Sequence, residues 1–364
     1  MNLSKSIDFL LENAGCVIQY RLRKEILNNI SKTEEENLLE QICQTPHFKL
    51  LQNYVKPSGY IGIGMHSWDK FKETYLQDGE TAARLLSYYS IPKNHPLIVN
   101  FIGAMRNDEI LRDEFSYYYP ETIRFEQRYM GQHNGTSLMV LVYAMQAMLG
   151  YGDDDYIKPF LDISLETFTR LLRLSSLDEI TIIRKHRKMD YYLVVADRYY
   201  PCMYHLAALA YTHIWRAPET VKAMADAINH MNTILKPDGN YGIKYETKYN
   251  GAFWPIFQPF RPFDVNMPDS ILYRRVLTEL AMLGAGTQIN VLQQSVDNVE
   301  EALSADGILR FNYAKPADRR KYIPQWPGYY VDVALEPNYK KKTALDCDMT
   351  FWAVQFLHLV KVRK

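Results

Sequence analysis

The chain has no excess of charge of either sign. Lys and Arg together number 42, and Asp and Glu together also number 42, so the formal net charge is zero. Proteins that bind nucleic acid or an anionic membrane through a broad charged surface need a surplus of basic residues. The composition therefore argues against both kinds of partner, and we expect no nucleic-acid ligand.

Cysteine is scarce, and long apolar runs are missing. Cys16, Cys43, Cys202 and Cys347 show no C-x-x-C spacing, which argues against a zinc ribbon or a disulfide framework and is typical of a reducing compartment. The longest apolar run, 138–149, is too short to span a bilayer. The N-terminal stretch "MNLSKSIDFLLENAG" lacks the uninterrupted apolar core of a signal peptide. Together these absences predict a soluble, cytoplasmic protein with no transmembrane segment.

Several well-known catalytic motifs are also missing. The sequence contains no G-x-S-x-G, no P-loop, no H-E-x-x-H and no D-D-x-x-D on a predicted helix. The absence of the last motif argues against an ionisation of a diphosphate triggered by metal ions. We therefore expect neither a bound metal nor another cofactor.

Helical periodicity dominates what is present. Six segments, beginning near residues 17, 80, 136, 201, 268 and 346, are predominantly apolar, and five of them are apolar nearly all round, as buried helices are. Amphipathic helices alternate with them at about 4–13, 35–46, 96–106, 155–173, 218–234 and 289–303. A long-period repetition of helical hairpins indicates an array of similar units. It predicts an all-α fold, an (α/α)6 toroid of six inner and six outer helices in one domain covering 1–364. An open helical solenoid is the main alternative.

The loops that lead into the buried helices are longer than the loops that leave them. Three contain Gly next to a short alternating stretch, at 57–64, 237–246 and 305–314, and 179–195 has the pattern of a β-hairpin. We therefore expect short strands and hairpins on the rim where the inner helices begin. Rigid scaffolds carry function on their long loops, so a pocket should open on that rim.

Aromatic residues are abundant and clustered. The chain has 28 Tyr, 15 Phe and 5 Trp; these either line ordinary loops or form a deep aromatic pocket for a hydrocarbon, a sugar or a carbocation. The predicted substrate-binding residues lie in rim loops or at the starts of buried helices: His133, Asn134, Tyr199, Tyr200, Tyr204, Trp254, Asp264 and Trp326. Asp78 and Glu80 occupy a similar position, where an N-cap is the simpler role for Asp78.

The last buried helix opens with "TALDCDMTF", in which Asp346 and Asp348 are one residue apart. In a helix, two such side chains point about 200° apart, so both cannot cap the same end. Asp346 can be explained as an ordinary N-cap, whereas Asp348 is predicted to be an acid facing a cavity, and both are candidate catalytic residues. Desolvation beside a second carboxylate would keep such an acid protonated at neutral pH.

The predicted ring, with its "PDGNYG" and "ADGILRF" turns, resembles the superfamily of terpenoid cyclases and protein prenyltransferases, which share an α/α-toroid fold. "DCDMTF" is similar to the Asp-x-Asp-Asp-Thr-Ala motif of class II terpene cyclases, including the squalene cyclase type, at Asp346, Asp348 and Thr350. It differs at Met349 and Phe351. The resemblance implies that Asp348 donates a proton to a prenyl chain, with Asp346 as its neighbour and aromatic walls that stabilise the cation.

Two other classes of function fit the same pattern. (α/α)6 toroids also include carbohydrate-active enzymes of the epimerase and glycoside hydrolase types, whose Tyr- and Trp-lined rims stack on saccharides. A non-catalytic toroid that binds a lipid or a protein partner is the third candidate. The predicted ligand is therefore a hydrophobic isoprenoid or a saccharide.

Overall fold

The computed structural model describes residues 3–64, 78–116, 138–185, 190–195, 201–236, 240–245, 248–251, 260–267, 270–312, 333–337 and 339–361. These residues fall into two compact units, both discontinuous in sequence. Unit 1 comprises 1–114, 262–278 and 294–364, and unit 2 comprises 115–261 and 279–293. The single toroid domain expected for 1–364 stays a prediction.

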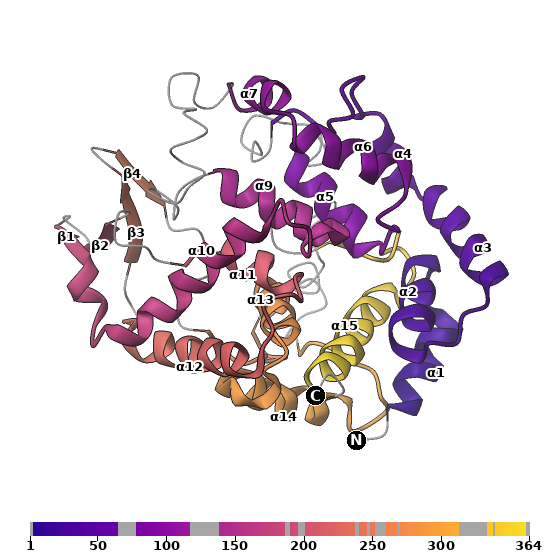
Figure 1. Ribbon diagram of the computed structural model, residues 1–364. Coiled ribbons are helices and arrows are strands. Elements are labelled where there is room, and N and C mark those ends of the chain that lie inside the picture. Colours follow the sequence, from indigo (N-terminus) through magenta and orange to yellow (C-terminus); the bar gives the residue numbers. More distant parts are fainter. Residues whose placement is uncertain are drawn as a thin grey trace. The chain divides into compact units, whose positions relative to one another are not determined.

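The described part of the chain is mostly helical, which confirms the all-α class (Figure 1). The helices are α1 (Ser4–Asn13), α2 (Cys16–Arg21), α3 (Lys32–Cys43), α4 (Pro46–Gln52), α5 (Gly79–Tyr88), α6 (Pro96–Met105), α7 (Asp108–Ser116), α9 (Leu138–Gln146), α10 (Lys158–Thr169), α11 (Met203–Ala210), α12 (Pro218–Ile234), α13 (Ser270–Met282), α14 (Asn290–Leu303) and α15 (Ala344–Lys361). A π-helical turn at Leu22–Leu27 prolongs α2, and another at Ala147–Tyr151 follows α9.

The positions of the predicted helices are confirmed. The six apolar segments form α2, α5, α9, α11, α13 and α15, and the amphipathic segments form α1, α3, α6, α10, α12 and α14. Every described residue of α11 is buried, and so are Gly79–Leu86 of α5, as an apolar surface all round requires. Two short helices, α4 and α7, were not predicted. The arrangement of the twelve helices in a ring stays a prediction.

In unit 1 the first and last helices of the chain pack against each other, since α15 contacts both α1 and α2. The Ser6 hydroxyl of α1 donates a 2.6 Å hydrogen bond to the Gly307 carbonyl. The Arg21 guanidinium of α2 lies 5.0 Å from the centre of the Phe351 ring on α15. Residues more than 300 positions apart are thus joined by direct contacts.

In unit 2, α11 contacts α9 and α10, and α10 also packs on α12. Beside these helices lies a four-stranded sheet in the order β1 (Thr181–Arg184), β2 (Tyr191–Val195), β3 (Asn240–Tyr245) and β4 (Lys248–Gly251). The β1–β2 pairing is antiparallel and confirms the hairpin expected at 179–195. The parallel β2–β3 pairing sets Tyr192 opposite Tyr241, with ring centres 5.5 Å apart. The strand expected at 305–314 is not formed in its described part, 305–312.

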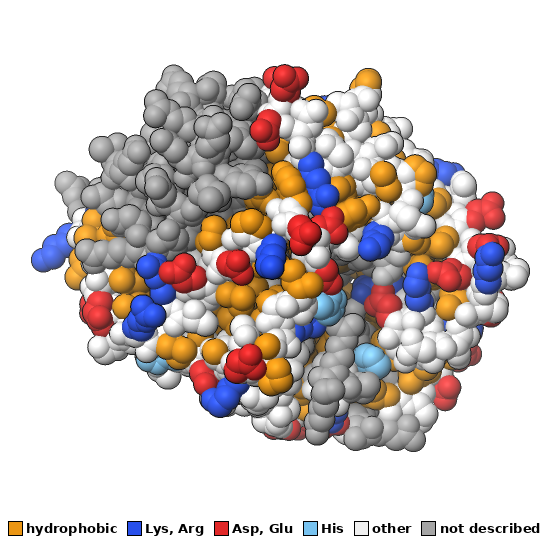
Figure 2. Space-filling model, in the orientation of Figure 1, with side chains coloured by type: hydrophobic (Ala, Val, Ile, Leu, Met, Phe, Trp, Pro, Cys, Tyr) orange, Lys and Arg blue, Asp and Glu red, His pale blue; other side chains and the backbone are white. Residues whose placement is uncertain are grey.

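Acidic and basic side chains alternate over the face of the described residues seen in Figure 2. Such a mixed surface agrees with the equal numbers of acidic and basic residues. Within the described ranges, none of the helices is both long enough and apolar enough to cross a membrane.

Candidate functional site

Helix α15 begins two residues earlier than the sequence suggested, at Ala344. Asp346 therefore lies inside the first turn and is not the N-cap. Its part as the neighbour of a catalytic acid stays a prediction. Its carboxylate is 25% exposed, and Oδ2 lies 3.5 Å from Nε of Arg310. An acid in the first turn of a helix is favourable because it faces the positive end of the helix dipole.

Asp348 is buried and already fully engaged with its own chain. Oδ1 accepts a 3.1 Å hydrogen bond from the Leu335 N–H, and Oδ2 accepts bonds from the Glu336 N–H, at 3.4 Å, and from the Tyr339 hydroxyl. Only 3% of the residue is exposed. Donors that reach both oxygens stabilise the ionised carboxylate, whereas a proton donor must be neutral before it reacts. The geometry is that of an anchor for residues 335–339, and the acid role stays a prediction.

Thr350 lies one turn beyond Asp346 on the same face of α15. Its buried Oγ1 accepts a 3.0 Å hydrogen bond from the Leu309 N–H. Asp346 and Thr350 thus hold the chain at 309–310, and Asp348 holds it at 335–339. The Asp-x-Asp-x-Thr spacing positions two loops on the start of α15.

Two further groups at this end of α15 are buried. Burial raises the pKa of the Cys347 thiol to about 12, so in the protein alone the sulfur is a protonated thiol. Burial also raises the pKa of Glu336, whose Oε1 accepts a 2.7 Å hydrogen bond from the Gly15 N–H just before α2. No group of three or more His, Cys, Asp or Glu side chains suited to a metal occurs among the described residues.

Of the other predicted site residues, the structure describes Tyr204 and Asp264. Tyr204 is buried in α11 of unit 2 and is 2% exposed. Asp264 closes a local turn in unit 1, where its Oδ1 accepts hydrogen bonds from the Asn266 N–H and amide at 2.8 and 2.9 Å. The remaining predicted residues lie outside the described ranges: His133, Asn134, Tyr199, Tyr200, Trp254 and Trp326.

The start of α5 holds a charged pair that the sequence analysis did not single out. Nε and Nη2 of Arg84 donate to Oε1 of Glu80 at 3.0 and 2.7 Å, and both side chains are 0% exposed. The signal was available in "GETAARLLSY", where Glu and Arg are four residues apart on an otherwise apolar helix. A pair of that spacing is usually solvated, so the fold alone reveals its burial.

Other polar groups surround the same helix end. Asp78 is the N-cap of α5, and its Oδ1 accepts hydrogen bonds from the Glu80 and Thr81 N–H groups at 2.9 and 3.3 Å. This confirms the capping role expected for Asp78. Gly79 donates a 3.0 Å hydrogen bond from its N–H to the Gly64 carbonyl. A Cβ at Gly79 would lie 2.8 Å from the Tyr60 hydroxyl, so only glycine fits there without displacing the phenol.

Charge is also buried on α13, another predicted inner helix. Arg274, Arg275 and Glu279 are each at most 4% exposed. The Arg274 guanidinium lies 5.8 Å from the ring centre of Trp352 on α15. The indole N–H of Trp352 donates to the hydroxyl of Thr278 at 3.0 Å. Predicted inner helices therefore combine apolar sequences with a few wholly buried ionic groups.

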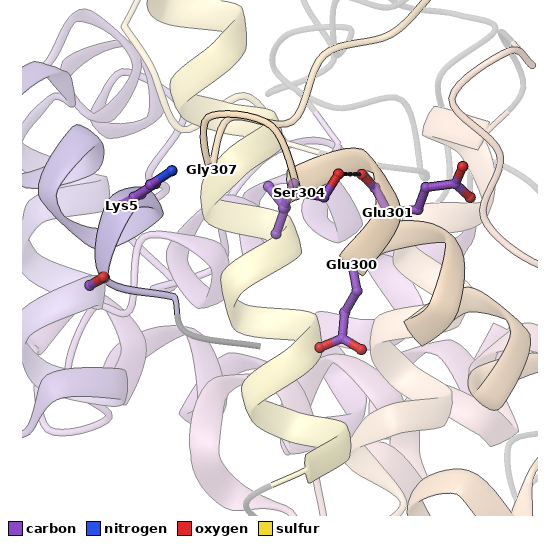
Figure 3. Close-up of a pocket in the computed structure, with 7 residues that line it drawn as sticks. Lys5, Glu300, Glu301, Ser304 and Gly307 are labelled. Atoms are coloured by element: carbon purple, nitrogen blue, oxygen red, sulfur yellow. Dashed lines mark hydrogen bonds between the residues drawn. The ribbon is translucent and has the colours of Figure 1, made fainter.

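An open pocket of about 570 Å³ lies in unit 1 between α1 and the end of α14 (Figure 3). Its lining residues are Ser4, Lys5, Glu300, Glu301, Leu303, Ser304 and Gly307, none of them aromatic. Glu300 and Glu301 point in different directions in Figure 3, and Glu300 pairs with Lys361 at 2.7 Å. This pocket is not the aromatic pocket predicted from the sequence.

Comparisons with known proteins give no relative: no family model, no curated protein and no solved structure matches this chain. The geometry of the site therefore has to carry the functional argument.

Proposed function

We propose that this protein is an α/α-toroid enzyme that performs acid–base chemistry on a small polar substrate of the carbohydrate class. One observation carries the proposal, namely the fully buried Glu80–Arg84 pair at the start of α5. The attraction within a buried ion pair hardly exceeds the cost of desolvating it, so such a pair is a weak device for stability. Buried ionisable groups of this kind cluster at functional sites.

The geometry of the pair suits a proton acceptor. Both donors of Arg84 reach Oε1 of Glu80 and stabilise the ionised carboxylate. The neighbouring cation keeps the carboxylate ionised and fixes its position, although it also lowers the basicity, and an ionised carboxylate is the form that can accept a proton from an activated hydroxyl or C–H. A substrate rich in hydroxyl groups also offers hydrogen bonds to buried polar groups that a hydrocarbon would leave unpaired.

Two further features support the toroid part of the proposal. Inner-type and outer-type helices alternate along the chain as the (α/α)6 pattern requires. The contact between α1 and α15 is the one that would close the ring, because α1 takes the last outer position and α15 the last inner position. A closed ring would set the starts of the inner helices around one rim.

The described aromatic residues of α15 give less support to a hydrocarbon chamber. The Trp352 ring lies 4.7 Å from that of Phe263 and 5.3 Å from that of Phe356, so these rings pack on one another. Protonation of a prenyl chain by Asp348 stays a second candidate, because the 3% exposure of Asp348 provides the desolvation that such an acid needs.

The test compares wild type with the double variant Glu80→Met/Arg84→Met. Replacing both members of a buried ion pair by apolar residues of similar volume is often neutral for stability, so the variant should fold. Its control is Glu166→Met/Arg170→Met on α10, an exposed pair with the same spacing. Thermal shift and product analysis by mass spectrometry would use neutral saccharides, sugar phosphates, prenyl diphosphates and squalene.

We expect neutral saccharides to stabilise wild type and the α10 control, and the α5 double variant to lose at least tenfold in affinity. Equal saccharide binding by all three proteins would contradict the proposal that the Glu80–Arg84 pair forms the binding site. Turnover of a prenyl substrate that is abolished by Asp348→Asn would instead establish the second candidate.

A further inference from the structure

Tyr60 is held rigidly in the turn that precedes α5. Its carbonyl accepts a 2.8 Å hydrogen bond from the Lys56 N–H, and a β-bridge joins Val55 to Ile61 on either side. The Tyr60 ring meets the ring of Phe101 edge to face at 5.3 Å. The position of the phenol is therefore fixed by its backbone and by its ring, without any contribution from the hydroxyl.

The Tyr60 hydroxyl is buried and has no hydrogen-bond partner in the described structure. Buried tyrosine hydroxyls normally find a partner, and each exception calls for an explanation. Tyr89, in the same unit and equally buried, follows the rule, because its hydroxyl lies 2.9 Å from Nδ1 of His47. The contrast indicates that the Tyr60 hydroxyl is reserved for a group that the described part of the chain does not supply.

The surroundings keep this hydroxyl protonated. Burial raises the pKa of Tyr60 well above its ordinary value, and the carboxylates of Glu114 and Asp78 raise it further. The phenol is therefore a hydrogen-bond donor at every physiological pH. The absence of a Cβ at Gly79 leaves room for it beside the first turn of α5.

We infer that the Tyr60 hydroxyl is a substrate-binding group, which donates a hydrogen bond to an uncharged oxygen of the polar substrate at the start of α5. The inference rests on the proposed function and narrows its substrate class. An anionic oxygen would be repelled by the Asp78 carboxylate, since Glu114 is paired with Lys56, whereas a sugar hydroxyl or carbonyl oxygen would not be repelled. Neutral saccharides are therefore favoured over sugar phosphates and sugar acids.

The test is Tyr60→Phe, which removes a single oxygen, with Tyr89→Phe as the matched control. Titration calorimetry would use D-glucose, D-mannose and N-acetyl-D-glucosamine as neutral probes and glucose 6-phosphate as the anionic probe. Urea unfolding of the same proteins would report stability. We expect Tyr60→Phe to weaken binding of the neutral probes at least tenfold without lowering the unfolding midpoint, because no bond within the protein is lost. Tyr89→Phe should lower the midpoint and leave binding unchanged.

Three results would overturn the inference while leaving the proposed function in place. In the first, Tyr60→Phe binds the neutral saccharides as wild type does. In the second, its unfolding midpoint falls as far as that of Tyr89→Phe. In the third, loss of the Tyr60 hydroxyl weakens the binding of glucose 6-phosphate only. The second result would show that the hydroxyl is satisfied internally, for example by a trapped water. If wild type binds none of the saccharides, or if Glu80→Met/Arg84→Met binds them as wild type does, the proposed function fails as well.

Discussion

The starts of α5 and α15 look alike in the sequence and differ in the structure. Each opens an apolar helix with two acids separated by one residue, Asp78 and Glu80 in one case, Asp346 and Asp348 in the other. At α15 both acids are bound to loop residues that lie elsewhere in the chain. At α5 the first acid caps the helix and the second pairs with Arg84 of the same helix.

The difference shows that a motif match does not define the contacts that its acids make. The Asp-x-Asp-x-Thr stretch that resembles a catalytic motif is engaged in holding two loops. The α5 stretch, which matches no motif, carries a wholly buried ion pair beside a phenol whose hydroxyl has no hydrogen-bond partner among the described residues. Buried charge and unsatisfied hydrogen-bonding capacity depend on packing, and packing is not written in a short motif.

The largest effect on the free energy of unfolding is expected for Arg84→Met. It leaves Glu80 as a buried charge without its partner, and removing one member of a buried ion pair costs about 3–5 kcal/mol. Urea unfolding would measure the loss. Arg170→Met removes the same interaction from an exposed Glu166 pair and should cost less than about 0.5 kcal/mol. Equal losses would show that burial does not distinguish the α5 pair.

The next largest effect is expected for Asp348→Ala. It should lower the free energy of unfolding by about 3 kcal/mol, because it removes the acceptor of two N–H groups and a hydroxyl. The matched substitution Asp346→Ala breaks a half-exposed pair and should cost at most about 1 kcal/mol. Chemical denaturation of both variants would show whether Asp348→Ala loses more unfolding free energy than Asp346→Ala. A stable Asp348→Ala protein would contradict the anchoring role and strengthen the case for an acid.

Gly79→Ala should destabilise the protein by about 1–3 kcal/mol, as overpacking does. The new Cβ would lie 2.8 Å from the Tyr60 hydroxyl and 3.1 Å from the Gly64 carbonyl. Gly103→Ala in α6 meets nothing within 4 Å and should stabilise by about 0.5–1 kcal/mol, because alanine favours the helix. In thermal unfolding, Gly79→Ala should lower the melting temperature and Gly103→Ala should raise it. Adding Tyr60→Phe to Gly79→Ala should recover part of the lost stability.

The smallest effect concerns pH. Because burial raises the pKa of Glu336 above its ordinary value of 4.5, the folded protein holds this proton more tightly than the unfolded chain. The contribution to stability is therefore full below pH 4.5 and declines as the pH rises towards the folded-state pKa. Glu336→Gln should abolish that decline and still accept the Gly15 N–H.

Glu300→Gln provides the control of opposite sign for this pH test. Lys361 lowers the pKa of Glu300, so its contribution is present above pH 4.5 and is lost in acid. Urea midpoints measured between pH 3 and 7 would follow both variants. A pH profile of Glu336→Gln identical to that of wild type would contradict the first expectation.

Much of the secondary structure was predictable because it depends on local patterns. The alternation of buried and amphipathic helices, the Asp78 cap and the hairpin at 181–195 follow from periodicity and from turn residues. The boundary of α15 was misjudged because Asp346 is a good capping residue, while the helix continues back to Ala344. Helix ends depend on the path of the preceding chain, which a single sequence does not define.

The partners of the candidate site residues were not predictable in the same way. Asp348 meets Tyr339 and two backbone N–H groups because the chain at 335–339 returns to α15, and nothing in "DCDMTF" encodes that return. The burial of Arg84 was missed because a Glu–Arg pair four residues apart is normally a surface feature. In both cases the burial of the charged group depends on how the surrounding chain packs.

The sequence by itself determined the helical class, the order of inner-type and outer-type helices and the balance of charge, since these follow from periodicity and composition. Only the tertiary structure decided which acids are used as anchors and which ionic groups are sealed from water. The physical reason is that hydrogen-bond partners and desolvation are set by how other segments fold back onto each helix. At α15 the segment 335–339 returns to satisfy Asp348, and at α5 none of the described residues meets the Tyr60 hydroxyl.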